Sequence, residues 1–273
     1  MQGPELAEPL RHPGPADGPR LMLAGSRIEE RVVTLAAGIP LEIAIAEALN
    51  GADSAWIRFA DGHGDLRFVL PDRATDGLHG AWYSTPRDSA DTPLYRAGIV
   101  WGWREGRVFG HCHGLWGGTM GHLLLDASQL TRPVRARAML FPDARFTASE
   151  DAETAFTLFK PEGHVNDRAD AALLRLAPHI DLCDGITDAV RKLGWARAQV
   201  EGIGSLNTAC FADGSILDSH ASEFLISDGV ATGFRADIAI DIVGIGGIRA
   251  AGLLRPGANP ICVTAEIILL RRA

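Results

Sequence analysis

The chain has few cysteines and no excess of basic charge. Its four cysteines, at positions 112, 183, 210 and 262 of 273, include no CxxC pair, so nothing in the sequence indicates a disulfide framework. The net charge is −8, and an acidic chain repels phosphate backbones unless its basic residues cluster. We therefore do not expect nucleic acid as a partner.

Long apolar runs are also absent. No apolar segment reaches membrane-spanning length, and the N-terminal sequence MQGPELAEPLRHPGPADGPR lacks the apolar core of a signal peptide. These absences predict a cytoplasmic protein without a membrane partner. Hydrophobic residues make up 47% of the chain and charged residues 22%, which is globular composition, and the length suits one large domain or two ordinary ones.

Local patterns predict an α+β chain that becomes ordered after a flexible arm. The prolines and glycines of residues 1–20 leave little to pack, so we expect a mobile arm there. The β-branched and apolar run at 31–38 predicts a strand, and the apolar spacing at 39–50 predicts a helix that stops at Asn-Gly. Two further strands are expected at 54–62 and 65–72.

The second part of the sequence repeats the plan of the first. Each copy has a helical segment with a Gly-containing stop, a tryptophan-bearing strand, a short GxGxL signature and an apolar run into a terminal strand, which predicts a tandem duplication. The matching segments are GIPLEIAIAEALNG (38–51) with HIDLCDGITDAVRKLG (179–194), GHGDLR (62–67) with GIGSLN (202–207), and 121–140 with 252–269.

These matches divide the chain into an N-terminal arm and two domains. The first predicted domain covers 21–142 and the second, a degenerate copy, covers 179–273. Between them, residues 143–178 are expected to form a connector that contains a helix. The reason is TASEDAETAF, in which acidic residues follow a Ser/Thr start as at a helix N-terminus.

The order of motifs resembles the PPC domain, the "plants and prokaryotes conserved" domain, over about residues 27–142 and 179–271. The resemblance implies two α+β domains, each an antiparallel β-sheet flanked by helices, and assembly as a homotrimer. It also implies the DNA-binding label of plant relatives, which bind DNA largely through a separate AT-hook built on Arg-Gly-Arg-Pro. This chain has no such core, as in a bacterial type without an AT-hook. The motifs are HCH (111–113), GH (121–122), GIGSLN (202–207), SEFLIS (222–227) and TAEIIL (264–269).

A histidine cluster carries the clearest chemistry. Side chains alternate along a strand, so His111 and His113 share a face while Cys112 points into the core. The glycine-rich GLWGGTMG can turn back sharply and bring His122 near the pair. Three imidazoles suit a zinc ion with an open fourth position, and the family resemblance agrees. The alternative is a set of polar residues on a half-exposed strand.

Two further histidines of the first domain are candidate catalytic residues. His63 and His79 are candidates for a general base or a substrate contact, and Asp65 is a candidate for orienting one of them. The alternative is that each is a surface residue of a turn. Arg67 and Arg104 are candidates for pairing with a substrate carboxylate.

The second domain has lost the cluster. Asp237, Ala239 and Leu253 stand about where the three histidines stand, so no three-histidine site can form there. We interpret this copy as a structural support that pairs with the first and walls its site. His220 and Glu223 are its nearby candidates for a contributed polar group.

Three functions follow as hypotheses. The first is a zinc-dependent enzyme or ligand-binding protein that acts on a small carboxylated compound by hydrolysis, hydration (a lyase) or isomerisation. The second is a DNA-binding regulatory protein, as the family label suggests. The third is a non-catalytic trimeric scaffold with a vestigial site. Self-association, most simply as a trimer, is expected in each case.

Overall fold

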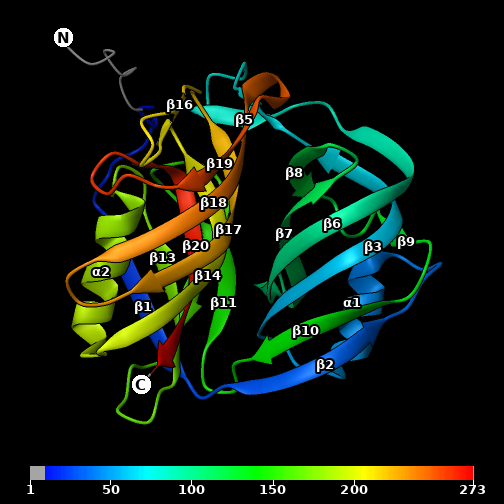
Figure 1. The fold of residues 1–273 in the computed structure, drawn as a ribbon, viewed down its shortest axis with the longest axis horizontal. Coiled ribbons are helices and arrows are strands. Elements are labelled where there is room, and N and C mark those ends of the chain that lie inside the picture. Colours follow the sequence, from blue (N-terminus) through cyan, green and yellow to red (C-terminus); the bar gives the residue numbers. More distant parts are fainter. Residues whose placement is uncertain (1–9, 273) are drawn as a thin grey trace.

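Two β-sheets face each other across the middle of the molecule, and each has one α-helix on its outer side (Figure 1). The structure is a computed structural model and describes residues 10–272. Neighbouring strands run antiparallel throughout both sheets except where β11 (Arg145–Glu150) meets β6 (Arg87–Arg104) in parallel. The expected antiparallel sheets are therefore present, with one α-helix each among the described residues.

The nine-stranded sheet contains the histidine cluster. Its order is β12-β11-β6-β7-β8-β3-β10-β2, with β9 on β3 and a further pairing of β3 with β6. Its helix is α1 (Leu41–Leu49). Its remaining strands are β2 (Glu29–Leu35), β3 (Ala55–Val69), β7 (Arg107–Trp116), β8 (Thr119–Leu123), β9 (Gln129–Leu130), β10 (Val134–Leu140) and β12 (Thr157–Glu162), and a separate hairpin joins β4 (Pro71–Arg73) to β5 (Ala81–Tyr83).

The seven-stranded sheet has the order β1-β13-β20-β14-β17-β18-β19. Its helix is α2 (Leu182–Leu193), and a short 3₁₀ turn covers Ile245–Gly247. Its strands are β1 (Leu21–Ser26), β13 (Ala171–Leu176), β14 (Arg197–Leu206), β17 (Ser222–Ala231), β18 (Ala236–Gly244), β19 (Arg249–Leu253) and β20 (Ile261–Arg272), and a separate hairpin joins β15 (Ala209–Cys210) to β16 (Ile216–Leu217).

The two sheets share one strand order. In the first, β2-β10-β3-β6-β7-β8 are successive hydrogen-bonded neighbours, and in the second β13-β20-β14-β17-β18-β19 are. In chain order, each run consists of one strand, one helix and five further strands. Each of these strands has the same place in its sheet as its counterpart has in the other sheet. The first sheet differs because β3 also pairs with β8, which closes β3, β6, β7 and β8 into a ring.

Both predicted helices form, and local chemistry explains their ends. Helix α1 stops at Asn50, which adopts a left-handed conformation with φ 49°. Helix α2 begins after Asp181, whose side chain accepts a hydrogen bond from the backbone N–H of Asp184. It ends at Gly194, which is also left-handed, with φ 65°. These stops are the ones that the sequence indicates.

The helix predicted within residues 143–178 is wrong. This segment forms β11, β12 and β13, and β11 and β12 pair with each other as antiparallel strands. The acidic residues that suggested a helix start belong to a turn instead. Asp151 accepts hydrogen bonds from the N–H and Oγ1 of Thr154, both at 3.1 Å.

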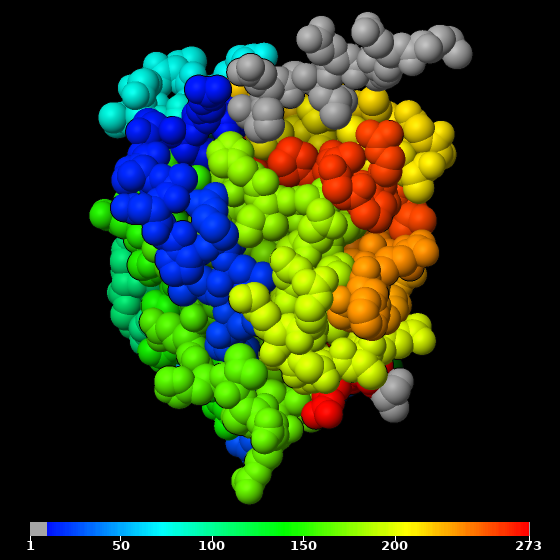
Figure 2. Space-filling view, turned by 90° about the vertical axis from the view of Figure 1, so that its left-hand side faces the viewer, coloured from blue at the N-terminus to red at the C-terminus, as the bar shows by residue number. Residues whose placement is uncertain are grey.

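The predicted boundaries do not follow the sheets. Strand β1 comes from the proposed first domain but pairs with β13 in the second sheet, and β11 and β12 extend the first sheet. The arm predicted at 1–20 falls partly outside the described residues, at 1–9. Residues 10–20 are held in place, since Leu10 is buried and Arg20 pairs with Glu153. Figure 2 shows the blue N-terminal part of the described chain lying against the green and yellow-green surface of later segments.

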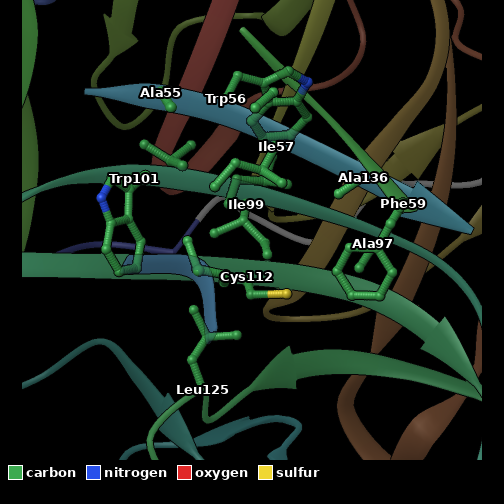
Figure 3. Close-up of a cluster of buried hydrophobic side chains, with 14 of the residues drawn as sticks. Ala55, Trp56, Ile57, Phe59, Ala97, Ile99, Trp101, Cys112, Leu125 and Ala136 are labelled. Carbon is green, nitrogen blue, oxygen red and sulfur yellow. The ribbon is translucent and has the colours of Figure 1, made fainter. Parts of the chain in front are cut away.

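Close packing joins the facing sheets. Gly98 on β6 leaves no room for a side chain, because a Cβ there would lie 2.6 Å from Leu225 of β17 and from Trp56. The Trp56 indole donates to the buried Glu201 carboxylate of the second sheet at 2.6 Å. On the outer side of the first sheet, Cys112 lies in the apolar core as expected (Figure 3). The sheets therefore form a single packed body around the histidine strand.

No α-helix among the described residues is long and apolar enough to cross a membrane.

Candidate metal centre between the sheets

A tight hairpin brings the three histidines together. Strands β7 and β8 are joined by Gly117 and Gly118, with φ 50° and 84°, and this pair of left-handed residues makes a two-residue turn. Counting back from the turn makes His113 and His122 direct cross-strand partners. His111 lies two residues before His113 on the same face. The predicted approach of the three side chains is therefore a consequence of strand periodicity and turn length.

The imidazole nitrogens are close enough to share an ion. One ligand nitrogen from each ring lies within 4.8 Å of the others. The Nε2 atoms of His111 and His113 are 3.2 Å apart. In a tetrahedral zinc site with Zn–N bonds of about 2.0–2.1 Å, ligand nitrogens are separated by roughly 3.3–3.4 Å. His111 and His113 already have this spacing, and His122 needs a small inward shift to match it.

Two of the rings form hydrogen bonds to the second sheet through their outer nitrogen, Nδ1, which points away from the other rings. His111 Nδ1 donates to the carboxylate of Glu266 on β20 at 2.7 Å. His113 Nδ1 donates to the backbone carbonyl of Phe224 on β17 at 2.9 Å. With its proton on Nδ1, the neutral His113 ring has its lone pair on Nε2, which faces Nε2 of His111. A carboxylate or carbonyl on the outer nitrogen is the usual arrangement behind a metal-bound histidine.

Two buried polar atoms beside the rings have no hydrogen-bond partner. They are Nδ1 of His122 and Oε2 of Glu223. Glu223 lies at the start of β17, and its Oε1 is 3.8 Å from His113 Nε2 and 3.9 Å from His122 Nδ1. Buried polar atoms normally have partners, so this cluster has the donor set that a cation would satisfy.

Burial governs the charge state of the site. It lowers the pKa of His113 and His122 well below the usual histidine value, and the nearby His111 adds to the effect. Burial also raises the pKa of Glu223 to about 8. Tyr83 has a raised pKa because it is buried and lies near Glu223 and Glu266. Near pH 7 the His113 and His122 rings are therefore neutral, which is the form that binds a metal.

The cluster lies in a cavity of about 590 Å³ between the sheets, within the size range of small-molecule sites. One wall is aromatic, with Trp82 stacked on Phe156 at 5.2 Å and the Tyr83 ring edge-on to His122 at 5.2 Å. Arg104 and Arg107 also line the cavity. The cavity thus combines candidate metal ligands, flat apolar surface and two guanidinium groups, which lie among acidic residues of the same lining.

The structure separates the three predicted catalytic residues. His79 lines the cavity, with Nδ1 2.6 Å from the Asp76 carboxylate and Nε2 3.3 Å from the carbonyl of Ala155. His63 and Asp65 are not among the described residues that line it. Asp65 does not act as an orienting partner for either histidine, because it accepts hydrogen bonds from the Asp91 N–H and the Gln129 amide.

Sequence reasoning missed three residues of the site. Glu266, Tyr83 and Phe156 come from segments far from the histidines in the chain. Only Glu266 carried a signal, as a single charge within the apolar run TAEIIL. Of the two polar groups expected from the second copy, Glu223 reaches the cluster, whereas His220 Nε2 lies 3.3 Å from the carbonyl of Gly80.

The second sheet keeps the hairpin without the histidines. Ala239 and Leu253 are cross-strand partners, as His113 and His122 are in the first sheet. Asp237 precedes Ala239 by two residues and pairs with Arg235 at the surface. The positions aligned from sequence are therefore equivalent in pairing, and they hold no nitrogen ligand.

No family model matches the chain, and no curated protein matches its sequence. Among solved structures, the plant- and prokaryote-conserved (PPC) protein of Pyrococcus horikoshii is 13% identical, with a TM-score of 0.37 over 50% of this chain and 94% of that one. The metal-containing protein of Archaeoglobus fulgidus is 20% identical, with a TM-score of 0.38 over 48% and 92%. A candidate DNA-binding protein of Bacteroides thetaiotaomicron is 12% identical, with a TM-score of 0.34 over 40% and 82%. Likenesses this distant assign neither a family nor a function to this chain.

Proposed function

We propose that this protein is a metal-dependent small-molecule enzyme or binding protein, with zinc held by His111, His113 and His122. The observation that carries the proposal is the convergence of three imidazoles, two of which have their outer nitrogens engaged by Glu266 and Phe224. These partners leave the inner nitrogens turned towards one another, as in a metal site supported from outside. When bound, the ion would supply a Lewis acid beside the cavity, as in hydrolases, lyases and isomerases.

The ligand we propose is a small carboxylated compound with a flat body. Arg104 supports this because it lines the cavity and lies over the ring of Phe109 at 5.1 Å. Among the described residues it has one ion pair, with the exposed Glu105, and that pair is long at 3.4 Å. Guanidinium groups recognise carboxylates through paired N–H donors. Arg67, the other candidate, is absent from the described lining. His79 remains a candidate for a substrate contact, because it borders the cavity.

Metal analysis of the purified protein tests the central claim. We expect about one equivalent of zinc or another divalent metal per chain, and its loss in a His111→Ala/His113→Ala variant that keeps its melting transition. A folded wild-type protein with far less than one equivalent after reconstitution would remove the metal-dependent function. It would leave the third hypothesis, a non-catalytic scaffold.

We also propose that the chain arose by tandem duplication of a PPC-like domain. The shared strand order of the two sheets supports this, as does the shared place of each helix after the first strand of its run.

We propose a trimer of the whole chain and a cytoplasmic location. Light scattering after size-exclusion chromatography tests the assembly, and a monomer at high concentration would contradict it.

DNA binding is the second candidate function. Two of the similar structures, from Bacteroides thetaiotaomicron and Ralstonia eutropha, are named as candidate DNA-binding proteins. The net charge of −8 and the absence of an AT-hook weigh against transfer of this activity. A gel-shift with generic duplex DNA at low salt tests this candidate function. A salt-sensitive shift would favour DNA binding, and the absence of any shift would exclude it.

A further inference from the structure

We infer that Glu223 is a fourth protein ligand of the metal, so that the ion is bound jointly by the two sheets. This inference rests on the proposed metal site. The first sheet supplies three nitrogen ligands from β7 and β8, and the second supplies a carboxylate from β17. The sequence offers Glu223 only as a candidate for a contributed polar group, and the histidines lie more than 100 positions earlier.

The first argument is that Glu223 faces two ring nitrogens without forming a hydrogen bond to either. His113 Nδ1 donates to Phe224, so its Nε2 carries a lone pair, and Glu223 Oε1 lies 3.8 Å from this atom. Oε1 is also 3.9 Å from the unpartnered Nδ1 of His122, and Oε2 has no donor at all. The Glu223 carboxyl group and these two ring nitrogens are too far apart to hydrogen-bond directly, and a cation between them would satisfy all three.

The second argument is that the backbone holds Glu223 in place. On one side, Ser222 Oγ donates to the carbonyl of Leu206 at 2.7 Å and accepts from its N–H at 3.2 Å. On the other side, the Phe224 carbonyl accepts from His113. The side chain between these anchors is buried, with 5% of its surface exposed, so it has little freedom to turn towards solvent. A pre-positioned carboxylate is a typical ligand for zinc and for harder divalent ions.

The third argument comes from the contrast with Glu266. The Glu266 carboxylate binds the outer nitrogen of His111, so it orients a ligand from behind. The Glu223 carboxylate faces the inner nitrogens, where the ion would lie. Two acidic residues of the second sheet therefore have different roles: Glu266 is a positioning residue and Glu223 is a ligand.

Cobalt(II) titration followed by visible absorption tests the assignment, because the spectrum reports both affinity and ligand set. We expect Glu223→Gln to weaken binding by roughly 100-fold or more and to change the spectrum of whatever cobalt it binds. Glu266→Gln should fall within the 10- to 100-fold loss typical of an outer partner and keep the wild-type spectrum. Glu201→Gln is the matched control, since it removes another buried carboxylate of the second sheet that contacts Trp56 instead of the histidines.

The outcomes separate this inference from the metal site itself. If the wild-type protein binds no cobalt or zinc, the proposed function fails and the ligand assignment fails with it. If the wild type binds metal and Glu223→Gln binds it equally well with an unchanged spectrum, the ligand assignment alone is overturned. Thermal melts of each variant without metal show whether it folds, and a variant that does not fold is replaced by Glu223→Ala.

Discussion

The hairpins β7–β8 and β18–β19 occupy the same place in their sheets, yet only the first has metal-ligand chemistry. In β7–β8 the cross-strand pair is His113 with His122, and it faces the opposite sheet. In β18–β19 the corresponding pair is Ala239 with Leu253, and Leu253 is 42% exposed. Equal topology therefore does not imply equal chemistry, because each site also depends on what the opposing sheet presents.

The two sheets also contribute different kinds of atoms to the candidate site. The first sheet provides nitrogen atoms from one local hairpin, whereas the second provides Glu223 and Glu266 from strands β17 and β20. The second sheet is therefore more than an inert support, although it has no histidine at the matching positions. Its Glu266 carboxylate and Phe224 carbonyl hold two of the histidines by their outer nitrogens.

The largest expected effect comes from removing one member of the histidine pair. We predict that His122→Ala lowers metal affinity by roughly 100-fold or more, because it removes a ligand. The matched change in the other hairpin, Leu253→Ala, should leave affinity unchanged. Isothermal titration with zinc measures both. Equal losses in the two variants would show that the hairpins are not functionally different.

The next effect is a pH-dependent gain in stability for metal-free Glu223→Gln. The pKa of Glu223 is raised to about 8 in the folded state, from an ordinary value near 4.5. The contribution of the Glu223 carboxyl group to the free energy of unfolding is therefore fully present below about pH 4.5. It is lost as the pH rises through 8, because the folded protein must then hold a buried charge. We expect the variant to match the wild type near pH 4.5 and to exceed it by roughly 2–4 kcal/mol at pH 9.

Denaturant unfolding of chelator-treated protein across this range measures the difference. The wild type with bound metal should lose the pH dependence, since a cation stabilises the ionised carboxylate. A constant difference between variant and wild type at all pH values would contradict the burial of Glu223 without a charged partner.

A smaller effect tests the packing that brings the two sheets together. Gly98→Val should destabilise the protein by about 1–3 kcal/mol, because the added atoms overlap Leu225 and Trp56 across the interface. Gly18→Ala is the control, since a Cβ there meets nothing within 4 Å. Thermal unfolding compares the two. Equal melting temperatures would show that the facing sheets can separate at this point without cost.

The smallest effect concerns the cavity wall. Arg104→Gln should weaken binding of benzoate, a flat carboxylate probe, by roughly three- to tenfold, because partly exposed ion pairs contribute little. Arg67→Gln, outside the described lining, should have no effect. Quenching of tryptophan fluorescence, with Trp82 in the wall, reports binding. Stronger binding of benzamide than of benzoate would contradict a carboxylate site.

Much of the fold follows from local patterns, and the errors have local causes. The helices at 41–49 and 182–193 were predictable because their apolar spacing and their stops at Asn50 and Gly194 act within one element. The helix expected in 143–178 was wrong because acidic residues near Ser and Thr serve turns as well as helix starts. The boundary of the first domain was misplaced because β1 pairs with a strand about 150 positions later.

By itself the sequence determined that His111, His113 and His122 would meet, since a two-residue strand period and a Gly-Gly turn are local geometry. Only the tertiary structure decided that Glu223 and Glu266 would face them. Their approach depends on two whole sheets packing together, which the spacing of residues along the chain does not encode. The same reason explains why Tyr83 and Phe156 entered the site unforeseen, while His63 and Asp65 did not reach it.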